Sequence, residues 1–154
     1  MGIKANRNNK RVLNVFVKEA VEKSEQLIVR NLQTVGEYAI GFARDGGLYT
    51  DRTGNLRSSV GYIITKNGKE IFKAGFDANA NSGTEGETGA RDGYKYALEL
   101  VKNHSGKYAL IFVAGMFYAE YVEKAGYDVL IGTEIEAKEF ARQLFSQISK
   151  QAKG

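Results

Sequence analysis

The chain has 154 residues, 43% of them apolar, which suits a single domain with a substantial hydrophobic core. It contains no cysteine and a single histidine, and these counts exclude disulfides, thiolate nucleophiles, cysteine-rich zinc sites and multi-histidine metal sites. The formal net charge is +4, and without a run of about 18 apolar residues or an apolar stretch behind the basic N-terminus we expect neither a membrane-spanning helix nor a secretory signal.

The N-terminal segment is polar and basic. Residues 1–9 lack hydrophobic periodicity, so we expect a disordered tail there, followed by a single domain over residues 10–152. Part of the positive charge lies in Lys4, Arg7, Lys10 and Arg11. A solvated tail is the simplest interpretation, and contact with nucleic acid or an acidic partner is the alternative.

A long amphipathic helix is predicted from about residue 10 to residue 44. Some 35 residues would span about 50 Å, whereas a globule of this size measures about 40 Å across, so the helix should project or break at Gly36 or Gly41. A projecting apolar stripe needs a partner to cover it. The stripe comprises Leu13, Phe16, Val17, Ala20, Ser24, Leu27, Ile28, Leu32, Val35, Ala39 and Phe42.

A β-hairpin is predicted over residues 60–76. Two apolar runs flank Asn67-Gly68, and both of these residues tolerate the positive φ of a type I′ turn. Residues 77–93 are polar and rich in glycine, which predicts a loop, and a short helix should follow over residues 90–103.

A buried strand is predicted over residues 107–114, because its side chains are apolar on both alternating faces. The long helix would cover one face, and the C-terminal helix or a neighbouring subunit would cover the other. Residues 116–125 then indicate a short helix that carries Tyr118 and Tyr121 on one face, and residues 127–131 an extended segment.

The last predicted element is a helix capped by Thr133 and running to about residue 152, with Glu136 at capping-box spacing. Together these elements predict an α+β fold. The long N-terminal helix and the C-terminal helix would pack on a small, mainly antiparallel β-sheet made of the hairpin and the central strand.

The loop at residues 77–93 is the first place to look for chemistry. Asp77, Asn79 and Asn81 match the first ligands of a calcium-binding EF-hand loop, but Ser82 and Thr88 stand where that loop needs Gly and a bidentate Glu. A loop of turn-forming residues is therefore the better interpretation, and no cofactor or metal is predicted.

Two further groups of polar residues were considered for catalysis. The carboxylates of Glu85, Glu87 and Asp92 could serve acid–base chemistry, although such groups on a loop are usually only solvated. His104 follows a predicted helix, where capping or turn formation is its expected role, because no nucleophile and orienting acid accompany it.

Two motifs carry a resemblance to a known family. The first is Asp51-Arg52-Thr53-Gly54-Asn55-Leu56-Arg57-Ser58-Ser59-Val60, and the second is the segment 118–130, YAEYVEKAGYDVL. In this order, between a long N-terminal and a C-terminal helix, they resemble the HK97 gp10-like family of tailed-phage neck and tail-completion proteins. The chain departs from many members by lacking proline and by carrying the segment 77–103.

The resemblance implies a non-enzymatic virion protein, located in the neck and assembled in the bacterial host cytoplasm. Copies would form a ring that joins capsid to tail, in contact with adaptor or head-completion proteins and tail proteins, around a channel for DNA. Its motif residues would be structural or interfacial: Asp51, Thr53, Gly54, Leu56, Arg57, Ser59, Tyr118, Tyr121 and Glu123. The alternatives are a small basic nucleic-acid-binding protein and an enzyme using the acidic loop at residues 77–93.

Overall fold

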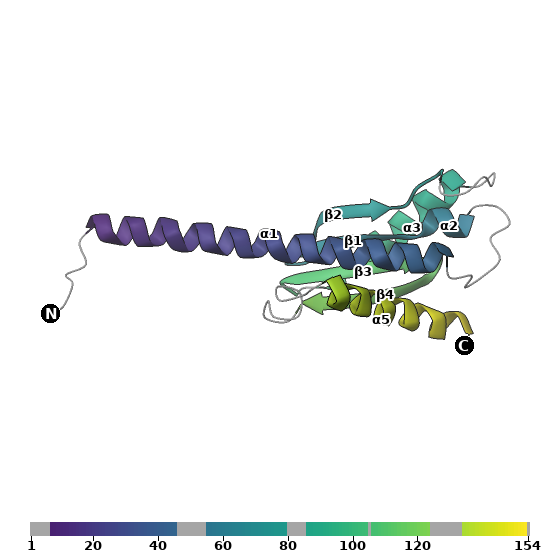
Figure 1. Ribbon diagram of the computed structural model, residues 1–154. Helices are drawn as coiled ribbons and strands as arrows, with labels where there is room; N and C mark the ends of the chain where they lie inside the picture. The colour runs from purple at the N-terminus through teal and green to yellow at the C-terminus, as the bar shows by residue number, and fades with distance from the viewer. Residues whose placement is uncertain (1–6, 46–54, 80–85, 105, 124–133, 154) are drawn as a thin grey trace.

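The computed structural model describes residues 7–45, 55–79, 86–104, 106–123 and 134–153. Its centre is a four-stranded antiparallel sheet with strand order β2-β1-β3-β4 (Figure 1). The strands are β1 (Gly61–Lys66), β2 (Lys69–Gly75), β3 (Tyr108–Ala114) and β4 (Phe117–Glu123). The predicted α+β fold is confirmed.

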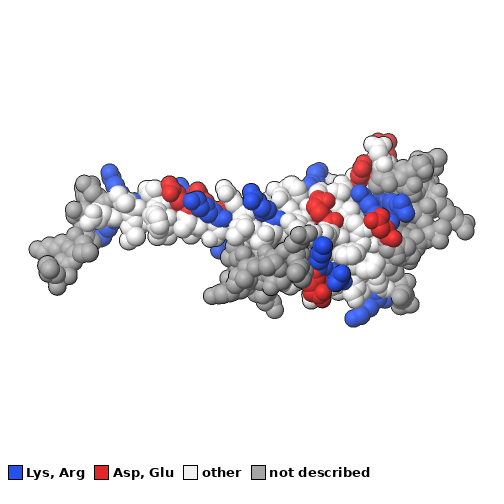
Figure 2. Space-filling view, in the orientation of Figure 1, with Lys and Arg blue, Asp and Glu red and all other residues white. Residues whose placement is uncertain are grey.

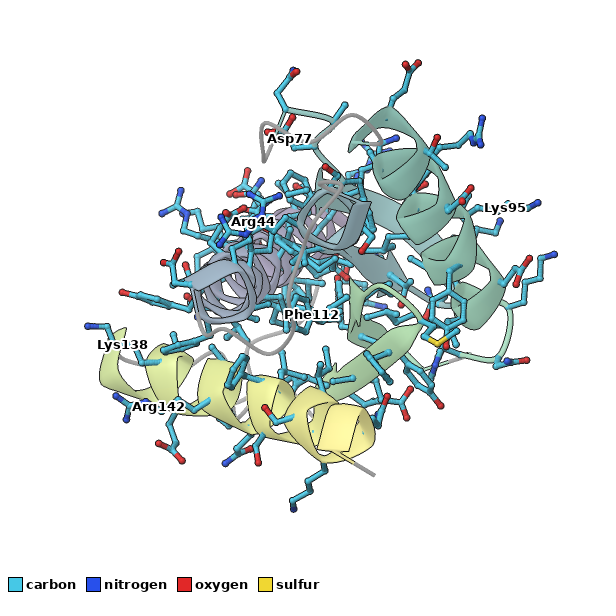
Figure 3. The ribbon with its side chains drawn as sticks, turned by 90° about the vertical axis from the view of Figure 1, so that its right-hand side faces the viewer. Arg44, Asp77, Lys95, Phe112, Lys138 and Arg142 are labelled. Atoms are coloured by element: carbon cyan, nitrogen blue, oxygen red, sulfur yellow. The ribbon has the colours of Figure 1, made fainter. Side chains whose placement is uncertain are left out.

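Helices cover both faces of this sheet. The long helix α1 (Arg7–Asp45) and the C-terminal helix α5 (Glu134–Lys153) pack on one face, and α3 (Gly86–Val101) packs on the other. The short α2 (Asn55–Ser59) lies beside α3 at the end of the sheet. Figure 3, which views the molecule from the side where α1 ends, shows Phe112 of β3 in the interior between these helices.

The period-two alternation of the central strands divides the core into two layers. Tyr62, Leu110 and Phe112 point to the layer shared with α1 and α5. Ile63 and Ile111 point to the layer shared with α3. All seven side chains of β3 are buried, as expected of a strand covered on both faces.

The cover of the second face differs from both alternatives that the sequence suggested. It is α3, whose Ala97 and Val101 are buried against Ile63, Ile111 and Val113 of the sheet. The C-terminal helix shares the first face with α1, where Leu144 and Ile148 are buried. The length of α5 agrees with the helix predicted over residues 133–152.

Helix α1 is continuous and projects beyond the sheet (Figure 1). It passes through Gly36 and Gly41 without a break, so the projecting alternative is the one observed. The tail predicted over residues 1–9 is wrong for residues 7–9, which are helical, and residues 1–6 lie outside the described part. Gly36 is buried under Tyr62, whose ring would lie 2.6 Å from an added Cβ.

The hairpin of β1 and β2 is confirmed, including its turn. Asn67 and Gly68 have φ values of 53° and 79°, the positive values that a type I′ turn requires. Strand pairing joins Lys66 to Lys69 across this turn. This turn lies at the end of the sheet from which α1 projects (Figure 1).

The short helix predicted over residues 116–125 is wrong, because residues 117–123 form strand β4. Tyr118 and Tyr121 are three residues apart, a spacing that puts them on one face of a helix but on opposite faces of a strand. Antiparallel pairing with β3 supplies the backbone hydrogen bonds that stabilise the extended form. The predicted extended segment 127–131 and the Thr133 cap lie outside the described residues.

The loop predicted over residues 77–93 is also partly wrong, since α3 begins at Gly86. Gly86, Gly89 and Gly93 are buried along one side of this helix. A Cβ on Gly93 would lie 2.5 Å from the carbonyl oxygen of Ser59. Close contact with α2 therefore compensates for the low helix propensity of these glycines.

Candidate functional site

The projecting part of α1 exposes an unusual amount of apolar surface. Every described side chain from Asn9 to Ser24 is exposed, and Phe16 keeps 69% of its surface accessible. Monomeric proteins rarely leave a contiguous apolar patch of this kind in water, so the patch indicates an interaction surface. We call this set the projecting stripe: Val12, Leu13, Val15, Phe16, Val17, Val21 and Leu27.

Burial of α1 begins immediately after this stripe. Leu27 is 41% exposed, whereas Ile28 is 6% exposed and belongs to the core. The 21 residues from 7 to 27 would extend about 30 Å at 1.5 Å per residue. Most of the stability of protein helices comes from tertiary packing, so a partner along the stripe would stabilise the helical form of this part.

An ion pair holds α1 at the point where it leaves the sheet. Lys66 Nζ donates to Glu25 Oε2 at 3.1 Å, which links the helix to the end of β1. This hydrogen bond lowers the pKa of Glu25 and raises the pKa of Lys66, so both side chains stay charged over a wide pH range.

A groove of about 460 Å³ opens beside this ion pair, between α1 and the hairpin. Its walls include Val29, Arg30, Ile71 and Tyr108 together with the ion pair itself. The mixture of apolar and charged walls resembles the edge of a protein interface more than a catalytic cleft.

The charges of the projecting helix are segregated along its axis. Arg7, Lys10, Arg11 and Lys18 precede its first acidic residue, Glu19. Glu22 and Glu25 follow, with Lys23 between them. Figure 2 shows Lys and Arg near the tip of the rod, and Asp and Glu farther along it with further Lys and Arg beside them. The first turn carries no acidic residue that would interact favourably with the positive end of the helix dipole.

A second, smaller apolar area lies on β4 and the turn before it. Met116 is 77% exposed, and Tyr118 and Val122 are each 37% exposed. Tyr118 packs edge-on against Tyr96 of α3, with ring centroids 6.3 Å apart. A groove of about 430 Å³ lies next to them and is walled by Gly89, Gly93, Asp92 and Met116 among others.

The structure links the first motif segment to the turn that precedes the second. Gly115 N donates to Ser59 Oγ at 2.7 Å, and Ser59 is buried at the end of α2. Gly115 is the first residue of the turn between β3 and β4, and its φ of 66° suits glycine. The first motif therefore fixes the turn that leads into the strand of the second motif.

Those of the remaining motif side chains that the structure describes lie apart from one another. Arg57 is exposed on α2, while Tyr121 points to the opposite face of β4 from Tyr118 and packs on Phe140, with ring centroids 5.0 Å apart. Asp51, Thr53 and Gly54 lie outside the described residues, as do the side chains of Leu56 and Glu123. Glu123 ends strand β4, where the sequence had predicted the helix over residues 116–125.

The acidic residues of the segment 77–93 are dispersed where they are described. Asp77 Oδ1 accepts a hydrogen bond from Asn79 N at 2.9 Å, which is the turn-forming role of such a residue. Glu87 and Asp92 are exposed on α3. Asp92 Oδ1 lies 3.5 Å from Nε of Arg91 on the same helix. Within the described ranges, no three His, Asp or Glu residues are placed to hold a metal ion.

His104 lies in the turn after α3, as expected, and its backbone N–H donates to Val101 O at 3.0 Å. Its side chain has a further role, because Nε2 lies 2.7 Å from Glu120 Oε2 of β4. This contact connects α3 to the edge strand.

Sequence reasoning missed part of the projecting stripe and the glycine face of α3. Val12, Val15 and Val21 fall outside the predicted helical stripe, and Val12 and Val15 lie on another side of α1. Their signal was the apolar run from residue 12 to residue 17, which is interrupted only by Asn14. The signal for α3 was the spacing of Gly86, Gly89 and Gly93, which follows a helical period.

The chain matches no family model, no curated protein and no solved structure in the comparisons made with each. Among the described residues, none of the helices combines the length and the apolar character needed to cross a bilayer. Function is therefore argued from the exposed surfaces and from the motifs.

Proposed function

We propose that this chain is a structural subunit of a tailed bacteriophage or prophage, in the neck between capsid and tail. It acts as a head–tail connector or tail-completion protein of the HK97 gp10-like type. It assembles into a ring with its own copies and binds the adaptor or head-completion proteins on one side and the tail proteins on the other. Its mechanism is binding and not turnover.

The observation that carries this proposal is the projecting stripe. Covering its seven large apolar side chains would stabilise an assembly by on the order of 10 kcal/mol, before the entropy cost of association. Val12 and Val15 lie on a different side of α1 from Leu13 and Val17, at 100° per residue. Such a wide arc needs more than one neighbour, as a subunit within a ring has.

The motif order adds a second, independent argument. The segment 51–60 leads into the hairpin, and the segment 118–130 begins in β4, in the order of the HK97 gp10-like family. The Ser59–Gly115 hydrogen bond, by which a residue of the first motif contacts the turn before β4, supports a structural role for that motif. Portal, capsid and tail genes beside the gene for this chain would support the assignment.

Removing apolar surface from the stripe tests the proposal. A phage carrying Leu13→Asp with Phe16→Asp should yield filled heads and free tails that fail to join, which electron microscopy and plaque counts would show. The matched control is Asn14→Asp with Gln26→Asp, which adds the same charge to the same helix at polar positions and should leave infectivity intact. Normal infectious particles from the first variant would contradict the proposal.

A nucleic-acid-binding protein is the second candidate. It is favoured by the basic side chains at the N-terminal end of α1. Arg7, Lys10, Arg11 and Lys18 could neutralise phosphates along a helix face. Binding of this kind loses affinity steeply as salt increases. DNA affinity of the purified chain that falls by orders of magnitude between low and physiological salt, and that disappears in Arg11→Gln with Lys18→Gln, would favour this candidate.

A further inference from the structure

We propose that the free edge of β4 binds an extended segment of a partner protein as an added, antiparallel strand of the sheet. Gln151 of α5 holds the first position of that strand until the partner binds. The segment that fits this edge alternates apolar and basic side chains. This inference goes beyond the neck role and does not rest on it, because it concerns only the purified chain and an extended peptide.

The pairing of the sheet shows which backbone groups of β4 point outward. Asn67 N donates to Lys107 O at 3.0 Å and continues the register of β1 with β3. Odd-numbered residues of β3 therefore bond to β1, and even-numbered residues of β3 bond to the odd-numbered residues of β4. The N–H and C=O groups of Tyr118, Glu120 and Val122 are left pointing away from the sheet, at its edge.

The first of these three positions already holds a peptide-like group. Tyr118 N donates to Gln151 Oε1 at 3.2 Å, and Gln151 Nε2 donates to Tyr118 O at 2.7 Å. One amide thus makes both bonds with one residue, which is the exchange that an antiparallel neighbour makes. The edge therefore accepts an amide in the antiparallel pattern. Gln151 is exposed, so a partner strand can displace it.

The next two positions have no such cover within the described part of the chain. The outward N–H and C=O groups of Glu120 and Val122 bond to none of the described residues. The side chains of these positions face the α3 side of the sheet, where Tyr118 and Val122 are each 37% exposed. Backbone groups of an edge strand, flanked by open apolar side chains, are the features to which another chain adds a strand.

The opposite edge of the sheet is protected against such pairing. β2 carries the exposed Lys69 and Lys73, and its register with β1 shifts between Ile64 and Thr65. Lysines and irregular pairing are common means of blocking an edge strand. β4 contains neither lysine nor arginine, and its register with β3 is continuous. Of the two edges, β4 is therefore the one suited to receive a strand.

The side chains of β4 define the chemistry of the partner. Directly paired residues of antiparallel strands point to the same face, so the partner's side chains would lie beside Tyr118, Glu120 and Val122. Apolar residues fit beside the tyrosine and the valine. A lysine or arginine fits beside Glu120, whose side chain is 41% exposed and lies 2.7 Å from His104 Nε2. The β4 of a second copy fits less well, because it brings another Glu120 to the same face.

Binding of a labelled peptide to the full chain tests the proposal. The probe is TVTKTVT, whose valines and lysine would pair with β4. Fluorescence anisotropy should show saturable binding to the wild-type chain. Gln151→Ala should bind the peptide about tenfold more tightly, because the position at Tyr118 opens. Gln147→Ala, at an exposed position one turn earlier on α5, is the control and should leave the affinity unchanged. A Gln151→Ala chain that fails to bind at about 1 mM peptide would overturn the proposal.

N-methylated peptides test the pairing itself. Methylation of the valine and lysine nitrogens removes the donors that face β4 and should abolish binding, whereas methylation of the threonine nitrogens leaves those donors intact and should preserve it. Hydrogen exchange at the amides of Glu120 and Val122 should slow when the peptide binds. Equal binding of the two methylated peptides, or a wild-type dimer that protects the same amides without peptide, would overturn the proposal.

Charge reversal tests the preference for a basic partner. The wild-type chain should bind TVTKTVT more tightly than TVTETVT, and Glu120→Lys should reverse this order. A wild-type chain that prefers the glutamate peptide would contradict the proposed chemistry. None of these experiments depends on phage assembly, so a failure here leaves the neck role to its own test.

Discussion

The side chain of Gln151 makes two hydrogen bonds with the backbone of Tyr118. Tyr118 N donates to Gln151 Oε1 at 3.2 Å, and Gln151 Nε2 donates to Tyr118 O at 2.7 Å. An amide side chain from the last part of α5 thus occupies the place that a neighbouring strand would take on the free edge of β4. Edge strands invite pairing with other chains, and this contact blocks one position of the edge.

Removing this contact should weaken the domain and expose its edge. Gln151→Ala should lower the free energy of unfolding by about 1 kcal/mol, the usual net value of exposed hydrogen bonds, and should increase aggregation on heating. Urea unfolding and light scattering would measure the two effects. Gln147→Ala, at an exposed position one turn earlier on α5, is the control and should change neither.

Two glycines in helices should respond in opposite directions to alanine. Gly93→Ala places a Cβ 2.5 Å from Ser59 O, so α2 and α3 must separate and stability should decrease by about 2 kcal/mol. Gly41→Ala meets nothing within 4 Å and should increase stability by about 1 kcal/mol, because alanine favours the helix. Thermal unfolding compares the two, and equal effects would show that the α2–α3 contact is looser than described.

Tyr62 should make the domain sensitive to alkaline pH. Its hydroxyl donates to Glu37 Oε1 at 3.0 Å, and burial first, then the negative charge of Glu37, raise its pKa well above the ordinary value. Above about pH 10 the unfolded chain loses this proton while the folded chain keeps it, so stability falls as pH rises. Urea unfolding from neutral pH to about pH 11 should show this fall.

The Tyr62→Phe variant separates this contribution from that of the other tyrosines. It should cost about 1 kcal/mol at neutral pH through the lost hydrogen bond, and its stability should fall less steeply above about pH 10. An unchanged alkaline slope in the variant would assign the effect to other tyrosines whose pKa is also raised, such as Tyr96 and Tyr108.

The acidic segment provides a test against the enzymatic alternative. The proposed neck role predicts that Asp77→Asn, Glu85→Gln and Glu87→Gln combined leave phage assembly unchanged, because Asp77 and Glu87 are exposed and contribute to neither core layer. Particle yield and infectivity are the measurements. Loss of a chemical activity in this variant, with its fold retained, would favour an enzyme.

The sequence by itself determined the elements whose signals are local. Asn67-Gly68 sufficed for the hairpin, because its turn needs two residues that accept positive φ. The apolar period sufficed for α1 and α5, and the continuous apolar run for β3. The sequence also contained the apolar stripe on α1, but it left open whether that helix projects or breaks.

Only the tertiary structure decided the elements that depend on distant partners. Residues 117–123 form a strand because β3 offers them a ladder of hydrogen bonds, which local spacing does not reveal. The glycines of α3 form a helix because α2 packs against them closely. The extent of the projection follows from where Ile28 meets the sheet, and the sheet is assembled from strands far apart in the chain. Contacts of this kind outweigh local propensity because their burial energy exceeds the fractions of a kcal/mol that separate one backbone conformation from another.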